Sequence, residues 1–269
     1  MLDLQSHSTY SDGELPPAGV VAAAVKAGVT TLALTDHDGI DGVGEATTAA
    51  KEAGIVLVPA TEISCVHGSI DDMHMLGYWV DTTAIAPACE RAQRERITRA
   101  REIVEHLNAQ GVDVRFEDAI AEAGDASSVG RPHIAKAAGV KPEEMSAFFE
   151  EWLVPGAKAF VARRWPDAAE ATSIIHSAGG SAVLAHPFWD MDAPKEVGAL
   201  IDDLDLDGVE CFYPAHDRAQ TKFLLDLCTE RGLAATASSD FHGPSHKMFG
   251  SFGAYPTYGL GEPELPPAP

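Results

Sequence analysis

The chain has 269 residues, enough to bury a large core and to form one barrel-sized domain with or without an insertion. Its composition, with 45% hydrophobic and 22% charged residues, is ordinary for a soluble globular protein. The formal net charge of −22 argues against sequence-independent binding to long nucleic acid, and no apolar run approaches the length of a membrane span. A small phosphorylated ligand is still compatible with this charge, because bound divalent cations reverse the local field.

Cysteine spacing and the first residues predict a cytoplasmic protein. The four cysteines are scattered and form no CxxC pair, which argues against a structural zinc knot and for reduced thiols. Asp3 interrupts the first residues, and no basic segment followed by a long apolar stretch is present. We therefore expect no signal peptide.

Strand-like and helix-like segments alternate through the first third of the chain. Short apolar or β-branched runs predict strands, and the segments between them have helical spacing and end at Gly28 and Gly54. In chain order, we expect a strand at 2–6, a helix at 16–27, a strand at 30–35, a helix at 43–53, and strands at 55–63 and 73–80.

The same alternation returns after residue 165. Helices are predicted at 167–178, 195–204 and 215–231, and strands at 181–185, 208–213 and 234–239. Strands with helices between most of them are typical of an α/β protein with a parallel sheet, and this many units favour a closed barrel over an open sheet. In such barrels the chemistry takes place at the carboxyl ends of the strands.

The alternation is interrupted between residues 87 and 164, where apolar residues recur at helical spacing. We interpret 87–164 as an α-helical insertion that caps the barrel mouth, and 1–86 together with 165–250 as the barrel. The tail at 251–269 is rich in glycine and proline, and we expect it to be partly disordered.

Six short runs place metal-ligand side chains at the predicted strand ends. Neutral imidazoles together with carboxylates suit manganese, iron or zinc. Residues two apart on a strand face the same way, so Gln5 lies beside His7, and Asp240 lies beside His242. Their recurrence at successive strand ends predicts one shared site with more than one ion. The runs are 3–7 with Asp12, 35–38, 61–63, 74–77, 185–187 and 239–242.

These runs resemble the motifs of the PHP (polymerase and histidinol phosphatase) family. The string DLQSHSTYSDG at 3–13 is similar to the first motif, and TDHD, TEI, AHP and SDFH follow in the order of the later motifs. The SDG form and the string GRPHIA at 130–135 resemble one subgroup of metal-dependent phosphoesterases. Members of that subgroup act on nucleoside 3′,5′-bisphosphates, nucleotides or the 5′ ends of short RNA. The resemblance implies a distorted (β/α)7 TIM-like barrel and a three-metal site.

The resemblance also implies which residues hold two or three divalent ions, with Mn, Fe or Zn expected and Mg as a further option. A hydroxide bound to these ions would attack the phosphate, so no serine or cysteine nucleophile is needed. The expected catalytic residues are Asp12, His37, Asp240 and His242. The first ion would be held by Gln5, His7, Glu62 and Asp240, the second by Glu62, His74 and His186, and the third by Asp12, His37 and His242.

Donors for phosphate are expected outside the metal centre. Arg131 can make a bidentate contact and His133 can donate a hydrogen bond, although an Arg-Pro-His string also starts surface helices. Lys158 and Arg163 belong to a second basic group that either holds a second phosphate or is solvated surface. His216, after the predicted sixth strand, is a further candidate for substrate contact.

Gln5 stands where the family motif has a histidine. A carboxamide oxygen is neutral and is a poorer ligand than imidazole for borderline metals. The enzyme therefore either works with a weakened first ion or has become a phosphate-binding module with a degenerate centre. We favour the first alternative because every other ligand position is filled.

The sequence thus predicts a metal-dependent hydrolase of phosphate esters whose partner is a small phosphorylated substrate. A nucleotide phosphomonoester, first of all a nucleoside 3′,5′-bisphosphate, is the expected substrate, and 5′-3′ cleavage of short 5′-phosphorylated RNA is the alternative. An amidohydrolase-type barrel also places histidine pairs at strand ends. The incomplete His-x-His string and the phosphate-type donors argue against that third reading.

Overall fold

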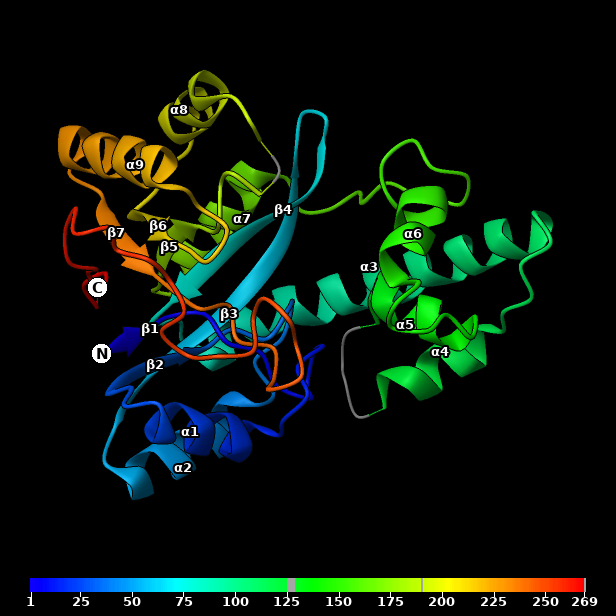
Figure 1. Cartoon of the computed structure of the whole chain (residues 1–269), viewed down its shortest axis with the longest axis horizontal. Coiled ribbons are helices and arrows are strands. Elements are labelled where there is room, and N and C mark those ends of the chain that lie inside the picture. Colours follow the sequence, from blue (N-terminus) through cyan, green and yellow to red (C-terminus); the bar gives the residue numbers. More distant parts are fainter. Residues whose placement is uncertain (125–128, 190, 269) are drawn as a thin grey trace.

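Seven strands form one mixed sheet that curls into a nearly closed barrel. The computed structural model describes residues 1–124, 129–189 and 191–268, and Figure 1 shows their arrangement. The strands follow one another around the sheet in chain order. They are β1 (Leu2–Asp3), β2 (Thr31–Leu34), β3 (Val56–His67), β4 (Ile70–Tyr78), β5 (Ser181–Leu184), β6 (Gly208–Phe212) and β7 (Ala234–Ala237).

The segments that follow the first and last strands approach each other and nearly close the barrel. The backbone N–H of Leu4 donates to the carbonyl of Ala237 at 3.1 Å, and that of His7 donates to Phe241 at 2.8 Å. Ser6 and Phe241 form an isolated parallel bridge just beyond the strand ends. The first and last predicted ligand runs therefore lie side by side.

The sheet differs from the predicted parallel sheet at β4. This strand pairs antiparallel with both β3 and β5, whereas the other neighbouring pairs are parallel. Only Gly68 and Ser69 separate β3 from β4, and Gly68 has a φ of 57°, which glycine adopts readily. A parallel strand requires a crossover of a dozen or more residues, so this turn permits only an antiparallel pair. The sheet is therefore parallel as predicted except at β4.

Five helices cover the outside of the barrel. Their ends carry the expected signals: Asp217 accepts hydrogen bonds from the backbone at the start of α9, and the left-handed residues Gly54 and Gly232 follow the ends of α2 and α9. The helices are α1 (Pro17–Lys26), α2 (Val43–Ala53), α7 (Ala168–Ser177), α8 (Pro194–Asp203) and α9 (Arg218–Arg231).

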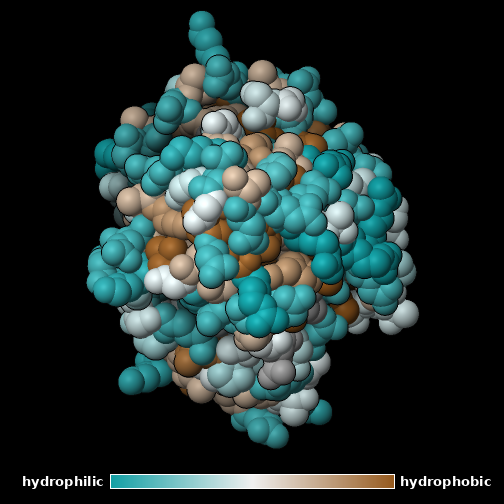
Figure 2. Space-filling model, turned by 90° about the vertical axis from the view of Figure 1, so that its right-hand side faces the viewer, coloured by the Kyte–Doolittle hydropathy of each residue, from teal (hydrophilic) through white to brown (hydrophobic). Residues whose placement is uncertain are grey.

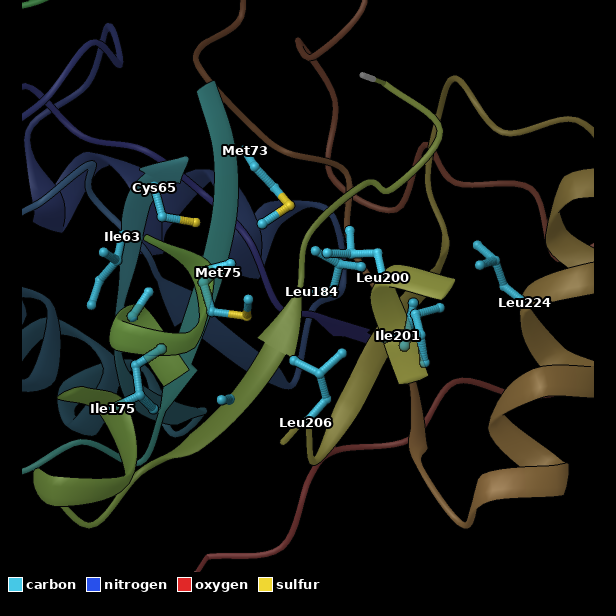
Figure 3. Packing of buried hydrophobic residues seen from close by; sticks show 14 of the residues in the cluster. Ile63, Cys65, Met73, Met75, Ile175, Leu184, Leu200, Ile201, Leu206 and Leu224 are labelled. Carbon is cyan, nitrogen blue, oxygen red and sulfur yellow. The ribbon is translucent and has the colours of Figure 1, made fainter. Parts of the chain in front are cut away.

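An aliphatic core lies between the sheet and these helices. Figure 3 shows Met75 of β4, Ile175 of α7 and Leu184 of β5 close to one another, with Leu224 of α9 on the far side of the cluster. The first three side chains and Leu224 are completely buried. This packing fixes β4, which carries His74, and β5, after which His186 follows.

A second core belongs to the helical insertion. The long helix α3 begins against the barrel, where Ile85 joins the barrel core, and it ends in the second core with Ile103 and Leu107. The smaller elements surround its distal half (Figure 1). The separate core supports a helical insertion, whose boundaries stay a prediction. Its elements are α3 (Thr82–Ala109), α4 (Phe116–Ala123), α5 (Arg131–Ala137), α6 (Met145–Phe148) and the π-helical turn η1 (Phe149–Leu153).

The outer face of the insertion is mostly hydrophilic. Figure 2 looks at the side that lies at the right of Figure 1, and hydrophobic residues gather near the centre of this face with hydrophilic residues around them. None of the helices in the described ranges is long and apolar enough to cross a membrane.

The tail contacts the barrel. Trp79 Nε1 donates to the carbonyl of Pro266 at 2.9 Å, and Ser181 Oγ donates to that of Pro267 at 3.0 Å. Composition alone predicted partial disorder, whereas residues 251–268 include these specific contacts with β5 and the end of β4. Residue 269 lies outside the described residues.

Candidate metal centre and substrate cavity

The predicted histidine, aspartate and glutamate ligands meet at one end of the barrel. Three groups of them place one ligand atom each within 4.8 Å of the others. His186 joins the same assembly through Glu62, whose Oε1 lies 3.4 Å from its Nε2. The three groups are His7 with Asp12, His37 and His242; His37 with Glu62 and His74; and His7 with Glu62 and Asp240.

Glu62 and His74 reach the centre from within strands. Because β4 runs antiparallel, its first residues lie at the same end of the barrel as the carboxyl ends of the parallel strands. His74, the middle residue of β4, pairs with Ser64 of β3. Glu62 lies inside the 12-residue strand β3, ahead of its end. The prediction that all six runs occupy carboxyl strand ends was therefore wrong for these two residues.

Glu62 is the centre of the assembly. Its Oε1 lies 2.9 Å from Nδ1 of His74, and its Oε2 lies 3.0 Å from Nε2 of His7 and 3.5 Å from Nδ1 of His37. Burial alone would raise the pKa of Glu62, but the nearby imidazoles of His37 and His74 hold it well below its usual range. The side chain is thus a carboxylate whose two oxygens face different histidines.

Asp12 is the carboxylate of a second group. Its Oδ1 lies 3.7 Å from Nδ1 of His7 and 3.5 Å from Nε2 of His242, and its Oδ2 lies 3.8 Å from Nε2 of His37. These separations are too long for good hydrogen bonds. Two ligands of a tetrahedral ion at metal distances of about 2.1 Å are about 3.4 Å apart, which is close to the separations seen here.

Burial and nearby charges shift the pKa values of the other ligands in opposite directions. Burial would raise the pKa of Asp240, but His242 and His7 lower it to about 2. Burial lowers the pKa of His37 to about 4. Burial also lowers the pKa of His186, but its hydrogen bond with Glu62 and the nearby negative charge outweigh burial and raise this pKa to about 9. A proton and a cation therefore compete for the same buried position between His186 and Glu62.

Several buried atoms of these residues lack a hydrogen-bond partner in the described part of the chain. They are Asp12 Oδ1, His37 Nδ1 and His186 Nδ1. Leaving a buried polar group unpaired costs about 1–3 kcal/mol. Imidazole nitrogens and carboxylate oxygens around shared positions form a donor set for divalent Mn, Fe or Zn. The residues present therefore fit divalent cations.

The backbone around the centre is unusual at three residues. Asp38, His186 and Asp240 have φ values of 51°, 24° and 53°, a region that side chains other than glycine seldom adopt. Such strain persists only where the surrounding structure holds it, and it concentrates at functional sites. Asp240 is held on its other side by Tyr213, whose hydroxyl donates to Oδ2 at 2.9 Å.

The serines of the first motif hold its loop. Asp36 Oδ1 accepts hydrogen bonds from the backbone N–H of Ser8 at 2.7 Å and from Ser11 Oγ at 2.8 Å, and Oδ2 accepts from Ser8 Oγ at 2.7 Å. All three residues are buried. Ser8 and Ser11 thus fix the loop that presents His7 and Asp12.

A cavity of about 220 Å³ lies between the metal-ligand residues and the insertion. Its barrel wall carries imidazoles and carboxylates, whereas its opposite wall carries four guanidinium groups. Arg131 and Arg163 are the two of these that the sequence predicted. The four arginines are Arg96, Arg99, Arg131 and Arg163.

Three other predicted substrate contacts lie away from the cavity lining. Lys158 is exposed, and its Nζ lies 2.5 Å from Glu151 Oε1. His133 Nδ1 accepts from the backbone N–H of Gly130 at 3.1 Å and so caps α5. His216 is buried with Nδ1 3.2 Å from the carbonyl of Cys211, and burial lowers its pKa to about 4.

Sequence reasoning missed Arg96 and Arg99. Both lie on α3, three residues apart and therefore on one helix face, in a chain with 19 basic and 41 acidic residues. Arg96 contacts Asp38 and donates to Ser64 Oγ at 2.6 Å, which ties α3 to the barrel. A pair of arginines on one face of an insertion helix was the signal available.

Asp72 of β4 was also missed. It contacts Arg131, and its Oδ1 lies 3.0 Å from Nη2 of Arg163. Burial would raise its pKa, but Arg131 and Arg163 hold it well below its usual range. An ionised carboxylate therefore sits between two guanidinium groups at the cavity wall.

Comparisons with known proteins show the family of the chain. The family model described as PHP domain matches residues 3–114. A protein of Chromobacterium violaceum named 3′,5′-nucleoside bisphosphate phosphatase is 33% identical over 258 residues, which cover 90% of this chain and 87% of that protein. The chain belongs to the PHP family. A Haemophilus influenzae family member named 5′-3′ exoribonuclease is 36% identical over 252 residues and covers 90% of both chains.

Solved structures share the whole fold of this PHP protein. A Chromobacterium violaceum structure, described as an amidohydrolase with bound sulfate and no metal, has a TM-score of 0.85 and 30% identity over 95% of this chain and 92% of that one. A structure from Bifidobacterium adolescentis, described as a candidate metal-dependent phosphoesterase, has a TM-score of 0.82 and 29% identity over 94% and 91%. The barrel with its insertion is therefore a shared architecture.

Proposed function

We propose that this PHP protein removes a phosphate from a nucleotide, with a nucleoside 3′,5′-bisphosphate as the first candidate. The chain is a hydrolase of phosphate esters, in keeping with the names of its relatives. The observation that carries the proposal is the cavity with metal-ligand residues on one wall and four arginines on the other. Both divalent ions and guanidinium groups bind phosphoryl oxygens.

The ligand assignment follows the three clusters. When bound, Mn, Fe or Zn would activate water as the nucleophile and offset charge on the phosphoryl oxygens. We assign Asp12, His37, Asp240 and His242 to the reacting end of the cavity. The first ion would be held by His7, Glu62 and Asp240 with Gln5, the second by Glu62, His74 and His186, and the third by Asp12, His37 and His242.

Arg131 and Arg163 are the proposed phosphate donors. Both now contact Asp72, so a phosphate dianion in the cavity would exchange with that carboxylate for the same N–H groups. Arg163 is 7% exposed, and a guanidinium held in so dry a site makes a stronger contact than a surface one. A second phosphate distant from the reacting one would fit these donors, as a bisphosphate requires.

Trp189 supports a nucleoside rather than a simple phosphate ester. Its ring lines the cavity yet is 53% exposed, with its centroid 6.4 Å from His186, 6.3 Å from Tyr213 and 5.8 Å from Phe249. A large aromatic side chain left open next to a phosphate site offers a face on which a base can stack. The proposed substrate therefore combines phosphates with an aromatic base.

Two alternatives follow from specific observations. The exoribonuclease name of one relative favours 5′-3′ cleavage of short 5′-phosphorylated RNA. Gln5 favours a phosphate-binding module with little turnover. The net charge of −22 leaves short strands as the compatible nucleic acids.

A cytoplasmic location is proposed from the cysteines. All four are buried and free, and Sγ of Cys211 lies 3.6 Å from Sγ of Cys228 without forming a disulfide. Neighbouring thiols that stay reduced are the rule in a reducing compartment.

The test measures the release of phosphate or of mononucleotide by the chelator-treated protein before and after addition of Mn²⁺, because 5′-3′ cleavage of RNA releases a nucleotide and no free phosphate. The substrates are adenosine 3′,5′-bisphosphate, a 5′-phosphorylated oligoribonucleotide and glycerol 3-phosphate. We expect phosphate release from the bisphosphate only with metal. His37→Ala should lower the rate of release by at least about a hundredfold. The control His106→Ala, whose side chain is exposed on α3, should leave the rate unchanged. Full activity without metal, full activity of His37→Ala, or release of ammonia from amide substrates would overturn the proposal.

A further inference from the structure

The side chain of Gln5 is fully buried with one of its polar atoms unpaired. Its Oε1 lies 3.2 Å from Ser238 Oγ, while its Nε2 has no hydrogen-bond partner among the described residues. A carboxamide N–H group buried without an acceptor is costly. The orientation of this carboxamide therefore needs an explanation.

Ser238 connects Gln5 to a buried glutamate. Ser238 Oγ lies 2.5 Å from Oε1 of Glu210, and Oε2 of Glu210 accepts from the backbone N–H of His186 at 2.9 Å. Glu210 lies in the middle of β6 and is completely buried, as is Ser238. The three side chains form one chain of contacts, Gln5 to Ser238 to Glu210.

Proton counting decides how this chain of contacts is arranged. A serine hydroxyl has one proton, so an acceptor on each side of Ser238 leaves one contact without a hydrogen. If Glu210 carried a proton, Ser238 could donate to Gln5, but Nε2 would stay buried without an acceptor. The nitrogen and oxygen of a carboxamide exchange places by a half-turn of the terminal torsion. After that turn, Nε2 donates one of its two hydrogens to Ser238 Oγ, and Ser238 donates to the Glu210 carboxylate, so that both contacts of Ser238 contain a hydrogen.

The same half-turn moves the Gln5 oxygen to the unpaired position. Gln5 is two residues before His7 in the segment after β1, and Ser238 is two residues before Asp240 in the segment after β7. His7 contacts Asp240 at 3.1 Å, and Gln5 contacts Ser238 at 3.2 Å. The Gln5–Ser238 contact is therefore the neighbour of the His7–Asp240 contact along these two segments.

We propose that Ser238 and Glu210 are positioning residues that turn the carboxamide oxygen of Gln5 toward the ion held by His7, Glu62 and Asp240. This inference rests on the proposed metal centre. The pattern is the one in which a metal ligand is oriented by a hydrogen bond to a carboxylate behind it. It keeps Gln5 as a neutral oxygen ligand, which suits Mn²⁺ or Mg²⁺ better than Zn²⁺.

The test titrates Mn²⁺ into chelator-treated protein by calorimetry and counts bound Mn²⁺ by electron paramagnetic resonance. We expect Ser238→Ala and Gln5→Ala each to weaken one Mn²⁺ site about tenfold or more. The double variant should be no weaker than Gln5→Ala alone, because Ser238 acts only through Gln5. Ser239→Ala is the matched control, since its buried hydroxyl has no partner in the described structure, and it should bind as the unaltered chain does.

Several outcomes would overturn the inference. They are unchanged Mn²⁺ affinity in Ser238→Ala, additive losses in the double variant, and a Mn²⁺-bound crystal structure of the unaltered chain in which Gln5 does not contact an ion. That crystal structure decides the question even if a variant fails to fold. A chain that binds no Mn²⁺ at all would sink the proposed function as well, whereas phosphate release with unchanged binding in Gln5→Ala would sink this inference alone.

Discussion

Replacing Glu62 by glutamine should destabilise the metal-free protein in a pH-dependent way. The substitution keeps the size of the side chain but removes the buried charge that faces His7, His74 and His186 at 3.0, 2.9 and 3.4 Å. The pKa of His186 is raised to about 9, above its ordinary value of 6.5, by the hydrogen bond and charge of Glu62 acting against burial. A raised histidine pKa contributes stability that is complete below pH 6.5 and is lost as the pH rises through 9.

The magnitude follows from these two pKa values. By linkage, the contribution of His186 is about 2 kcal/mol larger at pH 7 than at pH 9. Urea unfolding of the chelator-treated protein at both pH values measures this difference. We expect Glu62→Gln to lower the free energy of unfolding at both pH values. The loss should be about 2 kcal/mol smaller at pH 9 than at pH 7.

A surface pair is the matched control for this experiment. Glu102 contacts Arg164 at 2.9 Å, and the arginine side chain is 65% exposed. Glu102→Gln should change the free energy of unfolding by less than about 1 kcal/mol at either pH. If Glu62→Gln were as destabilising at pH 9 as at pH 7, the argument that Glu62 stabilises a protonated His186 would be refuted.

Four further outcomes are expected. Arg131→Gln should raise KM for adenosine 3′,5′-bisphosphate about tenfold or more. The control Arg115→Gln, which changes an exposed pair with Glu117, should leave KM unchanged. Equal KM values for the two variants would remove Arg131 from the phosphate site. Trp189→Ala should raise KM for the bisphosphate but not for glycerol 3-phosphate, and a parallel rise would argue against base stacking. Removal of metal should lower Tm in calorimetry, because an ion at a thousand times its Kd stabilises the native state by about 4 kcal/mol per site. Because an ion must displace the proton of His186, Mn²⁺ binding should release protons at pH 7 and should be tighter at pH 9. Calorimetry in buffers of different ionisation enthalpy measures the proton release, and finding none would contradict this prediction.

Local signals in the sequence determined the elements of the barrel and the chemical type of the site. The helix at Val43–Ala53 is found where its spacing and Gly54 predicted it, because helix ends depend on residues a few positions apart. His7, His37, Asp240 and their companions were identifiable because their motifs are short strings at the ends of strand-like runs. Their residue types indicate divalent ions, and their resemblance to the PHP motifs implied hydrolysis of phosphate esters.

Only the tertiary structure decided how distant residues meet. The antiparallel direction of β4 brings His74 to the centre from the middle of its strand, and this depends on pairing with both β3 and β5. Whether a basic residue faces the cavity depends on how the insertion packs. That packing turned Arg96 of α3 toward the cavity and left Lys158, which follows η1, on the surface. In the sequence, Glu210 is one acidic residue in an apolar strand, more than two hundred positions from Gln5. Only folding brings it into contact with Ser238, which in turn contacts Gln5. Periodicity and composition report on neighbours in sequence, whereas ligand geometry is set by packing between segments far apart in the chain.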